Sequence, residues 1–255
     1  MKVTLAIQRY NPEHDTAPQV REYEVEVEPT DRILDALMDI TRNVDGTLGY
    51  RRSCAHGVCG SDAMRINGKE RLACKTLFKD LVDADGPGKP AVITLEPLRH
   101  QAVQKDLMVD QGPFFEKFRA VKPYFMAKTE STGAEFLQSP EERSLFDEAT
   151  KCINCSACYS ACPVLDKNPA FLGPAAIVQA ARFIYDSRDK GLEGRIDVLD
   201  TADGVWPCES HFECTRVCPR EIKITRLINL TKREIKKYRE ARGEQTAEPA
   251  KQERA

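Results

Sequence analysis

The sequence contains no run of about 18 apolar residues, which is the length that a membrane-spanning helix needs. Its first residues hold only a short apolar stretch, interrupted by Gln8 and Arg9, and they do not resemble a signal peptide. The formal net charge of −2 does not indicate a nucleic-acid binder, because such proteins usually carry a strongly basic face. We therefore expect a cytosolic protein that has no nucleic-acid partner.

Signatures of catalysis and of nucleotide binding are absent as well. The chain has no G-x-G-x-x-G, no G-x-x-x-x-G-K-[ST] and no Ser, His and Asp set that indicates nucleophilic catalysis. We therefore expect no catalytic residue in this chain, and no flavin or nicotinamide site of its own.

Cysteine, by contrast, is plentiful: the chain has ten. In a cytosolic protein, closely spaced cysteines are more often metal ligands than disulfides. The spacing of these cysteines is typical of iron–sulfur clusters, whose irons prefer soft thiolate ligands. Three clusters in one chain indicate stepwise one-electron transfer. The three groups are Cys54-x4-Cys59-x2-Asp62 with Cys74, then Cys152-x2-Cys155-x2-Cys158-x3-Cys162-Pro163, and finally Cys208-x5-Cys214-x3-Cys218-Pro219.

The first group has the spacing of a plant-type 2Fe–2S site in which Asp62 replaces the third thiol. Because that spacing requires a donor at this position, we expect Asp62 to bind iron; the alternative is an exposed loop aspartate. Gly57 and Gly60 would let the loop bend tightly and bring amide N–H groups to the sulfurs. The expected ligands are Cys54, Cys59, Asp62 and Cys74.

The other two groups follow the bacterial two-cluster pattern, in which the fourth cysteine of each run serves the other cluster. The second run lacks its middle cysteine, and His211 stands at that position. Three thiolates predict a 3Fe–4S cluster; the alternatives are that His211 binds a fourth iron or that it is a surface or packing histidine. The expected 4Fe–4S ligands are Cys152, Cys155, Cys158 and Cys218. The expected 3Fe–4S ligands are Cys162, Cys208 and Cys214.

Zinc is the competing metal, because Cys-x2-Cys pairs also build tetrahedral zinc sites. A run of four cysteines that ends in proline is typical of clusters and not of zinc. We therefore expect iron and labile sulfide in the purified protein.

The first part of the chain is predicted to be rich in strands. Apolar and polar residues alternate over residues 3–8 and 23–27, which predicts two strands joined by a loop over 10–19. A helix capped by Thr30 is expected next, with an apolar face that includes Val44. A further β-rich stretch and a closing strand over 91–95 complete the pattern of a β-grasp domain.

The later part is predicted to be helical. A capping box of Ser139 and Glu142, with Pro140 in the first turn, predicts a helix that leads to Cys152. Other helices are expected over 114–120, from Pro174 onward and over 224–240. We therefore expect an α+β protein. Its parts are a β-grasp 2Fe–2S ferredoxin domain over 1–102, an all-α bacterial-type ferredoxin domain with two clusters over 103–242, and a disordered polar tail over 243–255.

Four segments resemble the iron–sulfur subunits of succinate dehydrogenase and fumarate reductase. They are RRSCAHGVCGSDAMRINGKERLAC (51–74), CINCSACYSACP (152–163), FLGPAAIVQAARFIYDSRD (171–189) and GVWPCESHFECTRVCPREI (204–222). The resemblance covers nearly the whole chain, and few families place a plant-type site before this paired bacterial-type set.

The resemblance implies an electron-transfer subunit. In this family, a flavoprotein subunit with covalent FAD oxidises succinate to fumarate. Electrons then pass through the 2Fe–2S, 4Fe–4S and 3Fe–4S clusters to a quinone at the interface with a membrane anchor, which in some complexes contains haem. FAD is therefore expected in the partner subunit only. The chain is expected to lie peripherally on the cytoplasmic face of the cell membrane, held there by the anchor.

The resemblance also implies a quinone site beside the third cluster. We assign Pro163, Trp206 and His211 to this site; a buried core tryptophan is the alternative for Trp206. Two departures from the family pattern concern the same pocket. Val164–Lys167 replaces a stretch in which many relatives have aromatic residues, and Glu209 replaces a histidine.

The sequence leaves the direction of the reaction open. Succinate dehydrogenase is the leading interpretation, and quinol:fumarate reductase, in which the same relay runs backwards, is the alternative. A diffusible ferredoxin-like carrier is a further alternative, which the length of the chain disfavours because a simple carrier needs only one small domain.

Overall fold

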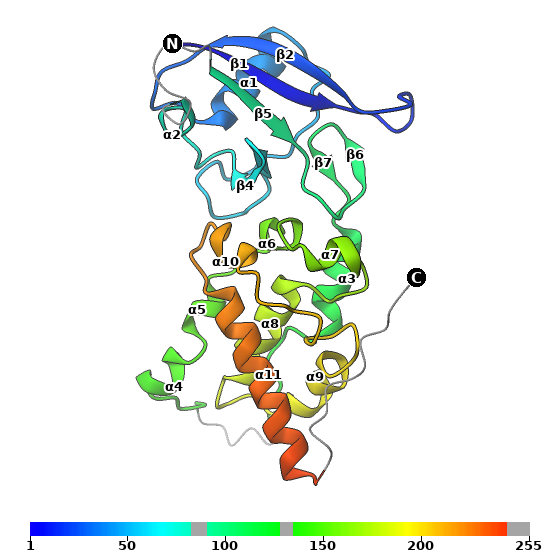
Figure 1. The fold of residues 1–255 in the computed structure, drawn as a ribbon. Coiled ribbons are helices and arrows are strands. Elements are labelled where there is room, and N and C mark those ends of the chain that lie inside the picture. The colour runs from blue at the N-terminus through cyan, green and yellow to red at the C-terminus, as the bar shows by residue number, and fades with distance from the viewer. Residues whose placement is uncertain (83–90, 128–134, 244–255) are drawn as a thin grey trace. The chain divides into compact units, whose positions relative to one another are not determined.

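The computed structural model describes residues 1–82, 91–127 and 135–243, and the chain forms two compact units (Figure 1). The first unit comprises Met1–Gln111 and Ile153–Ala161. The second comprises Gly112–Cys152 and the residues from Cys162 onward. The domain boundary predicted between residues 102 and 103 stays a prediction, and residues 244–255 of the predicted tail lie outside the described residues.

A five-stranded sheet forms the body of the first unit. The strands are β1 (Lys2–Arg9), β2 (Gln19–Glu26), β3 (Ala63–Ile66), β4 (Lys69–Leu72) and β5 (Ala91–Glu96). Their order is β2-β1-β5-β3-β4, with β1 and β5 parallel and the other neighbours antiparallel. The alternating residues Val3, Leu5 and Ile7 of β1 are buried in the core, as the period of a strand requires. The predicted strands are therefore confirmed.

Helix α1 (Ile33–Asn43) packs its apolar face into the same core. The predicted start of this helix was wrong, because its N-cap is Arg32 and not Thr30. Asp35 accepts a hydrogen bond from the Arg32 N–H at 3.0 Å and a second from the guanidinium Nε at 2.8 Å, which closes the first turn. Val44 was expected on the apolar face, but it follows the last turn and is exposed.

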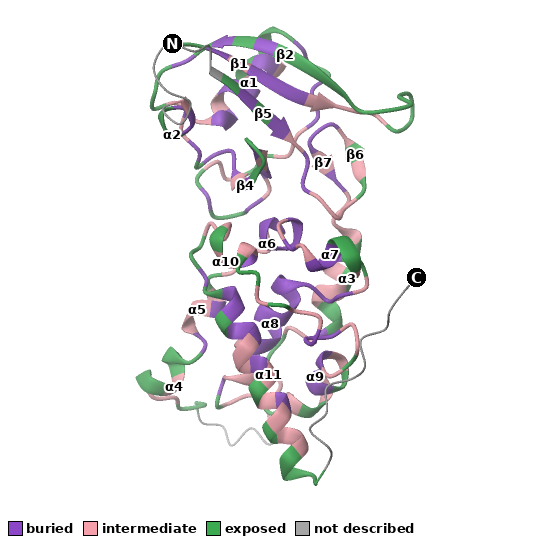
Figure 2. Cartoon of the chain, in the orientation of Figure 1, coloured by how far each residue is buried: buried purple, intermediate pink, exposed green. Residues whose placement is uncertain are grey.

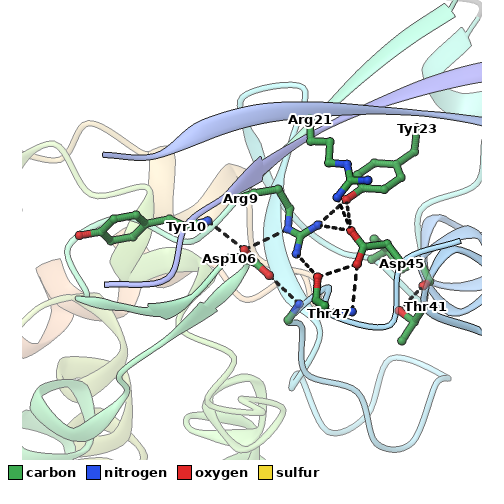
Figure 3. Close-up of polar contacts among 10 residues, drawn as sticks. Arg9, Tyr10, Arg21, Tyr23, Thr41, Asp45, Thr47 and Asp106 are labelled. Atoms are coloured by element: carbon green, nitrogen blue, oxygen red, sulfur yellow. Dashed lines mark hydrogen bonds and ion pairs between the residues drawn. The ribbon is translucent and has the colours of Figure 1, made fainter. Parts of the chain in front are cut away.

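A polar cluster ties β1 to the segment that leads into the first cysteine loop (Figure 3). Arg9 Nη1 lies 2.7 Å from Asp45 Oδ2, and the Tyr23 hydroxyl donates to the same carboxylate at 2.8 Å. Arg9 Nε lies 3.0 Å from Asp106 Oδ1, while Gly49 N–H donates to Asp106 Oδ2 at 2.7 Å. These interactions fix the path of the chain just before Cys54.

A second, two-stranded sheet consists of β6 (Val103–Lys105) and β7 (Met108–Val109). These two strands were not among those expected from the sequence, because strands of two or three residues are too short to show alternation. Arg51 donates to the Val109 carbonyl at 2.6 Å and to Gln104 Oε1 at 2.6 Å. The small sheet is thereby held against the segment that precedes Cys54.

Helices make up the second unit. They are α3 (Gly112–Ala120), α4 (Pro140–Ser144), α5 (Asp147–Thr150), α7 (Val164–Lys167), α8 (Pro174–Ile184), α9 (Leu192–Leu199), α10 (Glu213–Arg216) and α11 (Ile224–Ala241). Figure 2 shows that α8 is buried almost throughout, and α8 packs against α11. Within the described ranges, no helix is both long and apolar enough to cross a membrane.

The capping box predicted at Ser139 is present. Glu142 N–H donates to Ser139 Oγ at 3.2 Å, and Ser139 N–H donates to Glu142 Oε2 at 2.8 Å. The single helix expected up to Cys152 is instead two short ones, α4 and α5. The chain leaves helical geometry at Phe146, whose φ is −125° and ψ 0°, and this break places the Phe146 ring in the core.

Candidate iron–sulfur sites

The first cysteine loop, between α1 and β3, is bent around the sulfur of Cys54. Backbone N–H groups of His56, Val58 and Cys59 donate to this sulfur at 3.5, 3.4 and 3.3 Å. These hydrogen bonds, with that of His56 the largest cause, lower the pKa of the Cys54 thiol to about 6. The backbone therefore stabilises the thiolate, which is the form that binds metal.

Asp62 and Cys74 lie together on the buried side of this loop. Their exposed fractions are 3% and 2%, and the Cys74 N–H donates to Asp62 Oδ2 at 2.5 Å. Gly57, whose φ of 78° favours glycine, offers its backbone N–H to the Cys74 sulfur. The alternative of an exposed loop aspartate at position 62 is therefore excluded.

The electrostatics of this pair fit a site for a cationic group. Burial first, then hydrogen bonding to and repulsion from the Asp62 carboxylate, together raise the pKa of the Cys74 thiol to about 12. Two neighbouring buried groups that both become anionic destabilise the fold unless a cation lies between them. A metal ion removes this conflict, because a coordinating thiol is deprotonated outright.

Arg32 is a residue of this site that sequence reasoning missed. Its Nη1 donates to the Ala55 carbonyl at 2.9 Å, and it carries the positive charge near Cys74. Asp35 holds the guanidinium, with Nη2 to Oδ1 at 2.8 Å. No sequence pattern indicated Arg32, because this residue precedes α1 whereas the cysteine loop follows α1. Only the folded chain brings the two together.

The three cysteines of the predicted 3Fe–4S set, Cys162, Cys208 and Cys214, line one small pocket in the second unit. Burial raises the pKa of the Cys162 thiol to about 11 and also raises that of Cys214. The Cys214 sulfur lies 3.5 Å from the Thr225 hydroxyl. The fold thus brings these three thiols, which are far apart in the sequence, around one cavity.

Two of the three residues assigned to a quinone line the same pocket. Pro163 and His211 belong to its wall, and His211 Nε2 lies 3.0 Å from Glu209 Oε2 at the surface. Trp206 does not line this pocket. It is buried, and its Nε1 donates to Asp200 Oδ1 at 2.8 Å.

The two bacterial-type runs share an uncommon backbone pattern. In each run, the residues on both sides of the middle ligand position have a positive φ, which residues other than glycine rarely adopt. The angles are 52° at Asn154, 58° at Ser156, 60° at Ser210 and 66° at Phe212. The middle position is Cys155 in the first run and His211 in the second. The backbone therefore supports the alignment in which His211 replaces a cysteine.

The four cysteines of the predicted 4Fe–4S set are distributed over both units. Cys155 and Cys158 lie in the first, and Cys152 and Cys218 in the second. Their grouping stays a prediction. In the part of the chain that the structure describes, no three His, Cys, Asp or Glu side chains gather at the position of a single metal ion. Cluster ligands bind different irons and need not meet at one point.

Comparison with known proteins identifies two domain families in the chain. A 2Fe–2S iron–sulfur cluster binding domain matches residues 4–116, and a 4Fe–4S dicluster domain matches residues 148–222. The fumarate reductase iron–sulfur subunit of Mycobacterium tuberculosis is 41% identical and covers 87% of both chains. The succinate dehydrogenase iron–sulfur subunit of Coxiella burnetii is 37% identical, over 91% of this chain and 97% of its own.

A solved structure agrees with these relatives. A chain of the Mycobacterium smegmatis Sdh1 complex in the apo form matches with a TM-score of 0.82 and 28% identity. The match covers 94% of this chain and 97% of that one.

The fold and the matched domains define an iron–sulfur electron-transfer protein of α+β class, with a 2Fe–2S domain before a 4Fe–4S domain. The chain belongs to the family of iron–sulfur subunits of succinate dehydrogenases and fumarate reductases. The resemblance found in the sequence is thereby confirmed. The protein is a subunit of an oxidoreductase complex, it is not catalytic alone, and the alternative of a diffusible carrier is not supported.

Proposed function

We propose that this chain is the iron–sulfur subunit of a succinate dehydrogenase and passes electrons from the FAD of a flavoprotein subunit to a membrane quinone. The observation that carries the proposal is the pocket lined by Cys162, Cys208 and Cys214. Three thiols with a histidine at the fourth position suit a 3Fe–4S cluster, and this third set completes a relay that begins at the plant-type loop.

Three ligand sets are proposed. The first is Cys54, Cys59, Asp62 and Cys74 for 2Fe–2S; the second is Cys152, Cys155, Cys158 and Cys218 for 4Fe–4S; the third is Cys162, Cys208 and Cys214 for 3Fe–4S. When bound, these clusters supply sites that each accept and release one electron at a time.

The residues around the first set hold and tune the bound group. Three backbone N–H groups aimed at Cys54 stabilise negative charge on its sulfur, and hydrogen bonds to cluster sulfurs set the reduction potential. Asp62 supplies an oxygen donor from a buried position. Arg32 fixes the loop through the Ala55 carbonyl and offsets part of the anionic charge.

The residues around the third set shield it from water and leave one side open to a ligand. Cys162 and Cys214 are buried, whereas the His211 side chain on the same pocket is about half exposed. We infer that a quinone approaches over Pro163 and His211. Trp206, which is buried and hydrogen-bonded to Asp200, is a core residue and not part of this site.

The proposed partners are a flavoprotein subunit and one or more membrane anchor subunits. The support comes from the relatives, which are subunits of such enzymes and match along most of this chain. In this proposal, the chain is held peripherally at the cytoplasmic face of the cell membrane.

Replacing Cys214 by Ser in the native complex tests the proposal. The variant should lose succinate-driven quinone reduction, whereas the flavoprotein should still reduce an artificial dye with succinate. Cys214 is buried at the third set, so its loss interrupts the relay after the flavin step. Normal quinone reduction in this variant would contradict the proposed order.

Fumarate reductase is the second candidate, and the observation that supports it is the 41% identity with the Mycobacterium tuberculosis subunit. The two candidates differ only in the direction of electron flow. Rates of succinate oxidation and fumarate reduction in the native complex, measured together with the potential of its quinone, would distinguish them.

A further inference from the structure

The segment Ile153–Ala161, which carries Cys155 and Cys158, is packed into the first unit although it follows a long stretch of the second. Its short helix α6 (Ala157–Ser160) is held by two hydrogen bonds of the Ser160 hydroxyl. Ser160 Oγ donates to Glu70 Oε1 at 2.8 Å and accepts the Arg99 N–H at 2.8 Å. Ser160 has no exposed surface and Glu70 is 7% exposed, so breaking the Ser160–Glu70 bond leaves a desolvated carboxylate without this donor.

Gly60 is the point at which the first cysteine loop meets this segment. A Cβ atom at Gly60 would lie 2.5 Å from the Cys155 Cβ, 3.0 Å from the Cys155 Cα and 3.3 Å from the Ile153 Cδ1. The φ of Gly60 is 71°, so its backbone conformation also favours glycine. The backbone next to Cys59 therefore touches Cys155 with no side chain between them.

We propose that the contact between Gly60 and Cys155 is the junction through which electrons pass from the first cluster site to the second, with Gly60 as a positioning residue. This inference rests on the proposed ligand sets, in which Cys59 and Cys155 belong to successive sites. Each step moves one electron from the first site, which is oxidised, to the second, which is reduced, and no atom is transferred.

The physical reason is the steep loss of electronic coupling with distance through protein. Any side chain at position 60 must push Cys155 away from the loop, because the two nearest atoms that it meets are the Cβ and Cα of that residue and not the end of a flexible side chain. The hydrogen bond between Ser160 and Glu70 fixes the position of α6, at the other end of the segment that carries Cys155. It therefore helps to hold Cys155 against Gly60.

Gly68 provides a matched control in the same unit. Its φ of 72° equals that of Gly60 to within a degree. However, a Cβ at Gly68 meets only Arg65 Nη2, at 3.9 Å. Gly60→Ala and Gly68→Ala therefore both place an alanine at the same positive φ, and only Gly60→Ala displaces Cys155.

The test measures magnetic coupling between the first two sites in the native complex, isolated with its partner subunits and reduced with dithionite. The readout is the microwave power that half-saturates the 2Fe–2S signal in electron paramagnetic resonance, alongside iron and labile sulfide content. In the parent complex, the nearby reduced 4Fe–4S site should accelerate relaxation. Gly60→Ala should lower the half-saturation power severalfold at unchanged cluster content, and Gly68→Ala should leave it at the parent value.

Ser160→Ala and Glu70→Gln extend the test in case Gly60→Ala fails to load its clusters. Ser160→Ala should lower the half-saturation power in the same direction, because α6 loses its anchor. Glu70→Gln should keep the parent value, because the amide oxygen still accepts the Ser160 hydroxyl. Unchanged coupling in a fully loaded Gly60→Ala or Ser160→Ala complex would overturn the inference. A parent complex that lacks either cluster would instead contradict the proposed function.

Discussion

At the scale of single residues, two cysteines of the first site differ in how well their surroundings stabilise a thiolate. Hydrogen bonds from the backbone stabilise the anionic form of Cys54, while burial and Asp62 disfavour it at Cys74. A bound cationic group relieves the conflict at Cys74. We therefore expect Asp62 to bind iron, and its substitution should change the iron content of the first site.

Asp62→Ala should remove about two irons per chain, because the plant-type site loses one of its four donors. Asp62→Cys should retain them, since a thiolate is the usual donor at this position. Iron and labile sulfide analysis of the complex measures both outcomes, with Asp39→Ala on the exposed face of α1 as a control. Full iron content in Asp62→Ala would show that the carboxylate is not a ligand.

Asp45 should make the stability of the first unit depend on pH. Hydrogen bonds from Thr47, Arg9 and Tyr23 hold the pKa of its carboxyl well below the usual range. Because the folded pKa is lowered, this stabilisation is complete above the unfolded pKa of about 4 and is lost as the pH falls toward the folded value.

Asp45→Asn should therefore lower the free energy of unfolding by roughly 2–3 kcal/mol at neutral pH, where charge-assisted hydrogen bonds are lost. The difference between variant and parent should shrink below about pH 4. Urea unfolding of both proteins across this range measures it. A difference that stays constant down to about pH 3 would contradict this account of Asp45.

Among the helices and strands, those with a long and regular apolar pattern could be predicted from the sequence, and the shortest ones could not. The helices from Pro174 and from Ile224 show an apolar face over several turns, so their periodicity is readable. The strands β6 and β7 and the helices α7 and α10 have two to four residues each. No period can be read over so few positions, so only the fold reveals them.

The same limit applies to the sites. Cysteine spacing alone indicated the ligand sets, because closely spaced cysteine runs are typical of clusters and the fourth cysteine of each run serves the other cluster. The contact of Gly60 with Cys155 and the role of Arg32 depend on segments that are distant in sequence. The sequence around Gly60 and the sequence around Arg32 do not indicate which distant residues they contact.

Helix α4 offers a test of a local prediction. Ser139→Ala should cost about 1 kcal/mol of stability, because the Glu142 N–H loses its acceptor at the N-cap. Ser144→Ala serves as a control, since the Ser144 hydroxyl only donates back to the Glu141 carbonyl within the same helix. Thermal unfolding of the two variants measures the difference, and equal losses would argue that the cap contributes no more than the control serine.

For the whole molecule, the central feature is the division of the proposed ligands into three sets along one chain. Relatives that are subunits of succinate dehydrogenases and fumarate reductases match along 86% or more of this chain. The proposed clusters contain two, four and three irons, or about nine per chain. The central claim concerns the number of these clusters and their reduction by succinate.

Electron paramagnetic resonance of native membranes, first oxidised and then reduced with succinate, tests this claim most directly. The oxidised membranes should give the signal of a three-iron cluster, and succinate should abolish it as the 2Fe–2S signal appears. A membrane that contains the complex but gives no three-iron signal, or one whose signal persists after succinate reduction, would contradict the account.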